Sequence, residues 1–166
     1  MPDLLSHAFI AYSIGLVLSW RYDWLDARYV TIVMAGAFIP DIAKIVLVLP
    51  SEYVAALLGV PFDWLGIHTL GGAVCCGLVG VVLVDPAERR RVGTLLSIGA
   101  GSHLFADALL LNAAGYSYPL LYPLTSYAPP TPGVYLSSDI WPSLLTGAVA
   151  LGLWVFSRRR TLPKTA

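Results

Sequence analysis

The stretch Ser102-His103-Leu104-Phe105-Ala106-Asp107 lies inside an apolar run, from about Val92 to Ala114, that carries no other charge. A histidine and an aspartate four residues apart on a helix share one face, with Cβ atoms roughly 5–6 Å apart. Ionisable side chains at membrane depth are costly, so they indicate a functional site by default. The alternative is a hydrogen bond that packs two helices together, and this stretch alone leaves both interpretations open.

The composition indicates an integral membrane protein. Of the 166 residues, 57% are hydrophobic and 12% are charged, and the mean hydropathy is +0.74. Ordinary soluble domains carry roughly 25% charged residues. We therefore expect residues 1–166 to form one membrane domain in the plasma or inner membrane, with the lipid bilayer as its partner. The net charge is zero and the arginine clusters sit at expected membrane boundaries, so no nucleic-acid partner is predicted.

The order of apolar runs predicts an all-α, multi-pass helix bundle. The runs cover about 4–20, 29–49, 65–84, 92–114 and 140–156, which gives about five transmembrane helices. Arginines follow the first, third and fifth runs, whereas segments 50–64 and 115–139 contain neither Lys nor Arg. The positive-inside rule then predicts the N-terminus outside and the C-terminus in the cytoplasm. We expect segment 115–139 to lie as a cap on the outer surface.

Within the second run, Pro40 predicts a kink near Gly36, because proline removes one backbone hydrogen bond.

This topology predicts that five ionisable side chains lie at one depth. They are the three histidines of the chain and two aspartates, namely His7, Asp41, His68, His103 and Asp107. At a rise of about 1.5 Å per residue, all five fall in the outer half of a hydrocarbon core about 30 Å thick. Imidazole and carboxylate groups ligate Zn²⁺ and also suit Mn²⁺ or Fe²⁺. The sequence thus predicts a divalent metal site, with zinc as the first choice and Asp41 or Asp107 as a catalytic carboxylate.

Each of these residues also has a purely structural interpretation. His7 could lie at the membrane interface, and His68 could make a packed polar contact beside Thr69. Asp41 could form a salt bridge with Lys44, three residues further on. Lys44 itself could extend outward to the interface or neutralise an anionic substrate.

Several short elements of the sequence form a recognisable set. They are Ser6-His7-Ala8-Phe9, Pro40-Asp41-Ile42, Ile67-His68-Thr69, Ser102-His103 with Asp107, and Tyr118-Pro119-Leu120-Leu121-Tyr122-Pro123. With these elements, residues 7 to about 123 resemble the family of membrane-bound, metal-dependent hydrolases typified by YdjM, a LexA-regulated inner-membrane protein. The chain has Ala43 where the family usually has a second aspartate, and Asp63 where it usually has another histidine.

Two functions from different classes fit these observations. The first is a membrane-embedded, metal-dependent hydrolase that opens to the outer face and cleaves ester or phosphoester bonds of lipids or lipid-linked molecules. The second is a non-enzymatic membrane protein, either a structural partner in a complex or a metal or proton carrier. A carrier should have ionisable groups on both sides of the midplane, and the inner half shows none. The sequence predicts no oligomeric state.

Overall fold

The computed structural model describes residues 2–112 and 115–161, and this part of the chain is helical with two isolated β-bridges. Its elements are α1 (Pro2–Ser19), α2 (Ala27–Phe38), the 3-10 helix η1 (Pro40–Leu47), α3 (Ser51–Leu58), the 3-10 helix η2 (Trp64–His68), α4 (Leu70–Val82), α5 (Arg89–Asp107) and α6 (Trp141–Thr161). The predicted all-α fold class is confirmed.

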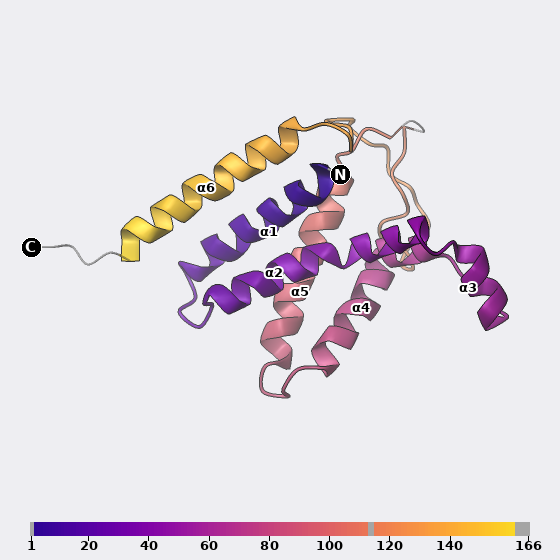
Figure 1. Ribbon diagram of the computed structural model, residues 1–166, viewed down its shortest axis with the longest axis horizontal. Helices are drawn as coiled ribbons and strands as arrows, with labels where there is room; N and C mark the ends of the chain where they lie inside the picture. Colours follow the sequence, from indigo (N-terminus) through magenta and orange to yellow (C-terminus); the bar gives the residue numbers. More distant parts are fainter. Residues whose placement is uncertain (1, 113–114, 162–166) are drawn as a thin grey trace, which may run out of the picture.

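The helices pack around α2 and α5. Helix α1 packs against both α2 and α6, while α5 packs against α2 and α4, and α3 projects from the rest of the molecule (Figure 1). The core lies between α1, α2 and α5, and its buried members are Ala11, Leu25, Val30, Val33, Ala37 and Leu95.

The predicted second helix is broken rather than kinked. Helix α2 ends at Phe38, η1 begins at Pro40, and the two axes differ by 49°. Pro40 lacks the N–H that would continue the α-helical ladder, so the backbone leaves the α-helix there. Within the described residues, no single helix is both long and apolar enough to cross a membrane. The bent pair α2–η1 meets these criteria of length and composition only as a unit.

Long-range hydrogen bonds set the end of α5. The apolar run predicts a helix to about residue 114, but α5 ends at Asp107. Beyond it, Leu111 N–H donates to the Tyr135 carbonyl at 2.7 Å, and Val134 N–H donates to the Leu109 carbonyl at 3.0 Å. These bonds to the segment before α6 replace helical ones, so Asp107 lies on the last turn.

The expected helix 65–84 is divided in the same way. Its first residues form η2, and α4 begins only at Leu70. Thr69 caps α4, because its hydroxyl accepts a hydrogen bond from Gly72 N–H at 3.2 Å. The cap separates the two elements and places His68 at the end of η2.

Two glycines allow α2 and α5 to cross in close contact. A Cβ atom on Gly99 would lie 2.0 Å from the carbonyl oxygen of Val33, and one on Gly36 would lie 2.4 Å from that of Leu96. Small residues of this kind let two helix backbones approach each other closely. The two helices are therefore held together at points one turn before His103 in α5 and one turn before the break at Pro40 in α2.

The α1–α2 connection, the α4–α5 connection and the end of α6 meet at one end of the bundle. Trp20 Nε1 donates to Ser157 Oγ at 3.3 Å, so the α1–α2 connection touches the last turns of α6. Tyr29 donates to Glu88, and the guanidinium group of Arg91 lies 5.2 Å from the ring centre of Trp24. The α1–α2 connection therefore contacts both of the other basic segments.

Candidate metal centre

Asp107, the last residue of α5, contacts all three histidines of the chain. Its Oδ1 atom lies 3.1 Å from His7 Nε2. Its Oδ2 atom lies 2.6 Å from His68 Nε2 and 3.2 Å from His103 Nε2. One carboxylate thus joins α1, η2 and α5, and it is largely buried, with 10% of its side chain exposed.

His103 lies at the centre of the cluster. Its ring stacks on that of His7, with centroids 3.8 Å apart, and meets the ring of His68 edge-on at 5.2 Å. The residue is completely buried, and among the described residues its Nδ1 atom has no hydrogen-bond partner, while Nε2 lies 3.2 Å from Asp107 Oδ2. Buried imidazole nitrogens without such partners are unusual in a folded protein. A bound cation would explain why a buried ring nitrogen of His103 has no hydrogen-bond partner.

Asp41 enters the cluster from the first turn of η1. Its Oδ1 atom lies 3.8 Å from His103 Nε2 and 2.5 Å from Lys44 Nζ. The salt bridge considered in the sequence is therefore present, and the same carboxylate also faces the histidines. Only 6% of the Asp41 side chain is exposed, whereas 30% of the Lys44 side chain is exposed. The lysine thus connects the buried cluster with its surroundings.

The ring of His68 is oriented by the backbone at the α2–η1 break. Its Nδ1 atom lies 3.1 Å from the carbonyl oxygen of Pro40. A carbonyl only accepts, so Nδ1 carries the hydrogen. In a neutral ring, Nε2 would then present a lone pair to Asp107 at 2.6 Å. Two acceptors facing each other require a proton or a metal ion between them. Histidines that bind metals commonly donate their other N–H to a carbonyl in this way.

The spacing of the donor atoms fits a metal ion. Two sets of three donors each lie within 4.8 Å of one another: His7, His103 and Asp107, and Asp41, His68 and His103. Ligand atoms on a tetrahedral zinc, each at about 2.0–2.1 Å, lie roughly 3.3–3.4 Å apart. The contacts of Asp107 with His7 and His103, at 3.1 and 3.2 Å, are close to that range, whereas its contact with His68, at 2.6 Å, is a hydrogen-bond distance. The five predicted residues come together, while their metal-binding role remains a prediction.

The two positions that depart from the family pattern lie outside both sets of donors. Ala43 is a buried residue of η1, with 3% of its surface exposed. Asp63 caps η2 by accepting a hydrogen bond from Leu65 N–H at 2.9 Å. The site is therefore formed without a carboxylate at position 43 or a histidine at position 63.

The segment 115–139 contributes a residue that the sequence analysis did not assign to the site. The ring of Tyr118 lies 6.3 Å from that of His68, in an edge-on arrangement. Leu120 and Tyr122 accept hydrogen bonds from the first N–H groups of α4, Leu70 at 2.7 Å and Gly71 at 2.8 Å. The segment is thus held against the start of α4. The Tyr118-Pro119 element of the family resemblance was the signal that could have identified this tyrosine.

Together, the fold and the cluster define a strongly apolar, all-helical protein with a candidate metal centre built from α1, η1, η2 and α5. The chain belongs to the YdjM inner membrane protein family, whose sequence profile matches residues 1–164. This membership confirms the resemblance inferred from the histidine and aspartate elements and places the protein at the inner membrane. Comparisons with curated proteins and with solved structures give no match.

Proposed function

We propose that this protein is a membrane-embedded, metal-dependent hydrolase whose centre consists of His7, Asp41, His68, His103 and Asp107. The observation that carries the proposal is the convergence of five ionisable side chains, from four separate elements, on one buried point. Burying so many ionisable groups is costly unless they pair or coordinate a metal. A catalytic metal centre would explain why the fold buries these groups despite the free energy that their burial costs.

The histidines and Asp107 would hold the ion, and zinc is the first choice for this donor set, with manganese or iron as alternatives. A bound divalent ion supplies a Lewis acid and lowers the pKa of water toward neutrality. The contacts of Asp107 with three histidines favour a ligand role for this carboxylate. Asp41 contacts only His103 among the histidines, at a longer 3.8 Å, and we assign it as a further ligand or as the general base.

The proposed substrates are lipids or lipid-linked molecules with an ester or phosphoester bond. Membership in an inner membrane family gives the site access to such molecules. Lys44 brings a positive charge to the edge of the cluster, where an anionic phosphoester could replace its contact with Asp41. Tyr118 lies beside His68 and is exposed, so segment 115–139 would border the path of entry.

The proposed topology is a multi-pass bundle with the N-terminus outside and the C-terminus in the cytoplasm. Contacts such as Trp20–Ser157 and Trp24–Arg91 gather the arginine-bearing segments at one end of the bundle. The positive-inside rule assigns that end to the cytoplasm. The cluster at the opposite end of α5 would then face the outer half of the membrane.

A structural role is the second candidate, and the observation that favours it is the direct hydrogen-bond distance of 2.6 Å between His68 Nε2 and Asp107 Oδ2. With protonated histidines, the contacts of Asp107 would hold α1, η2 and α5 together without a metal. This interpretation predicts a stable protein with neither metal nor activity.

Hydrolysis assays on the purified protein in detergent distinguish the two candidates. We expect zinc or manganese to support cleavage of a chromogenic phosphodiester or carboxylic ester, and a chelator to abolish it. Asp41→Asn should lose activity, whereas Asp63→Asn, a matched change at the cap of η2, should retain it. Folded protein that neither takes up the supplied metal nor cleaves either substrate would support the structural role instead.

A further inference from the structure

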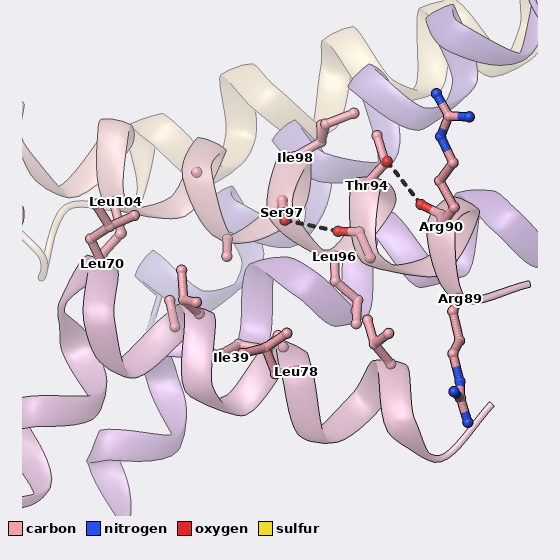
Figure 2. A pocket seen from close by; sticks show the side chains of 17 residues that line it. Ile39, Leu70, Leu78, Arg89, Arg90, Thr94, Leu96, Ser97, Ile98 and Leu104 are labelled. Carbon is pink, nitrogen blue, oxygen red and sulfur yellow. Dashed lines mark hydrogen bonds between the residues drawn. The ribbon is translucent and has the colours of Figure 1, made fainter. Parts of the chain in front are cut away.

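A groove of about 710 Å³ runs between α4 and α5, separate from the histidine cluster. Figure 2 shows Leu70 and Leu104 at one end of it and Arg89 and Arg90 at the other. The sixteen residues from Arg89 to Leu104 span roughly 22 Å of helix at about 1.5 Å per residue. The groove is therefore long and narrow, and its volume falls within the roughly 300–1,000 Å³ of ligand sites.

The walls of the groove are apolar along most of this length. Its two hydroxyl groups are occupied within α5 itself, since Thr94 donates to the carbonyl of Arg90 at 2.9 Å and Ser97 donates to that of Gly93 at 2.8 Å (Figure 2). Along the rim on α4, Val74 and Leu78 have about half of their surface exposed, at 51% and 56%. An occupant would thus meet hydrocarbon rather than free polar groups.

The groove is open because small residues line it. Ala73 and Gly77 come from α4, and Ala100 and Gly101 come from α5. A Cβ atom added to Gly77 or to Gly101 would meet nothing within 4 Å. These two positions therefore face open space, and a methyl group can be added at either one without a clash.

The end of the groove at Arg89 and Arg90 is positively charged. In residues 2–112 and 115–161 neither guanidinium group forms a salt bridge, whereas the neighbouring Arg91 pairs with Glu88 at 3.1 Å. Both arginines are exposed, and both line the groove. Their side chains extend to opposite sides of this end (Figure 2), and Arg89 Nε donates to the Val84 carbonyl at 3.4 Å. Apolar walls that end at two cations without a carboxylate partner are complementary to an acyl chain that ends at an anionic phosphate.

We infer that this groove binds an anionic glycerophospholipid, with one acyl chain between α4 and α5 and its phosphate at the end of the groove that carries Arg89 and Arg90. An inner membrane protein meets such lipids in its own surroundings. Basic pockets between membrane helices are known to bind anionic head groups. The inference is independent of the metal centre, because no residue of the cluster lines the groove. The bound lipid fills the space that the small residues leave and stabilises the packing of α4 against α5.

Lipid affinity of the purified full chain tests the inference. Phosphatidylglycerol and phosphatidylcholine with identical acyl chains are titrated into protein in a mild detergent, and bound lipid is counted by native mass spectrometry. We expect phosphatidylglycerol to bind more tightly. Changing both Arg89 and Arg90 to Gln should remove this preference. We expect each substitution to lower the affinity for phosphatidylglycerol roughly fivefold at low salt. The control changes Arg158 and Arg159, at the end of α6, to Gln and should keep the preference.

A second pair of variants tests the acyl-chain half of the groove. Gly77→Leu should lower the binding of both lipids, because the new side chain occupies the groove, and leucine favours a helix more than glycine does. Gly152→Leu is the matched control, since a Cβ atom there also meets nothing within 4 Å. Equal binding of the two lipids by the unchanged protein would overturn the inference. Full lipid binding by Gly77→Leu would also overturn it. If the unchanged protein is a dimer and Gly77→Leu is a monomer, the groove is occupied by a second copy of the chain and the inference is wrong.

Discussion

His7 Nε2 lies 3.1 Å from Oδ1 of Asp107, so α1 and the last turn of α5 meet at one buried carboxylate. The other oxygen of this carboxylate faces His68 and His103. The resulting arrangement resembles a set of ligands more than a single hydrogen bond between two helices. The predictions below separate these two interpretations and test the fold that supports the site.

Asp107→Asn keeps the size of the side chain but removes its negative charge. If Asp107 is a ligand, the affinity for zinc should fall at least 10–100-fold, which is roughly the loss seen when a group that hydrogen-bonds to a metal ligand is removed. A purely structural hydrogen bond should instead cost about 0.6 kcal/mol of stability, the average for such bonds in membranes. Zinc affinity from competition with a chelating dye and thermal stability in detergent give the two numbers. Unchanged zinc affinity with reduced stability would identify Asp107 as a packing residue.

Lys44→Gln tests whether this lysine recognises an anionic substrate. The substitution removes the cation that lies 2.5 Å from Asp41. Loss of a hydrogen bond to a charged group costs about 1.5–3 kcal/mol, so KM for an anionic phosphodiester should rise at least roughly tenfold. Lys44→Arg, which keeps the charge, should restore most of the binding. KM for a neutral ester should stay the same, and an equal rise for both substrates would contradict this role.

Gly99→Ala tests the close crossing of α2 and α5. The added methyl group would lie 2.0 Å from the Val33 carbonyl oxygen and 2.7 Å from the Ala37 nitrogen, both of which belong to the backbone. We expect a loss of about 1–3 kcal/mol, typical of overpacking. Gly101→Ala, where the methyl group meets nothing within 4 Å, should instead stabilise the helix by about 0.5–1 kcal/mol. Melting temperatures in detergent compare the two variants, and equal values would show that the helices do not cross this closely.

Reporter fusions along the chain test the topology. Fusions within 21–28, within 86–91 and at residue 160 should report the cytoplasm, because arginines cluster there. Fusions at residues 55 and 130 should report the exterior. A cytoplasmic signal from residue 130 would contradict the assignment of the cluster to the outer half of the membrane.

Much of the site could be predicted from the sequence because ionisable residues are rare in its apolar runs. His7, Asp41, His68, His103 and Asp107 stand out for this reason, and the structure brings them together. The all-helical fold follows from the same runs of apolar residues.

Other features depend on contacts between distant segments, which local patterns do not encode. The end of α5 at Asp107 results from hydrogen bonds to residues 134 and 135. The proline at position 40 indicated a kink, but the contact of its carbonyl with His68 requires η1 and η2 to be packed side by side. The arrangement of Tyr118 beside His68 depends likewise on how segment 115–139 folds back onto α4.

The metal content of the purified protein distinguishes a metal centre from a purely structural cluster. The protein should be purified without chelators, and its metals measured by mass spectrometry alongside His103→Gln, a change at the centre of the cluster. We expect about one divalent ion per chain in the unchanged protein and a clear loss in the variant. Folded protein that holds no ion, and takes up neither zinc nor manganese when they are supplied, would contradict this expectation.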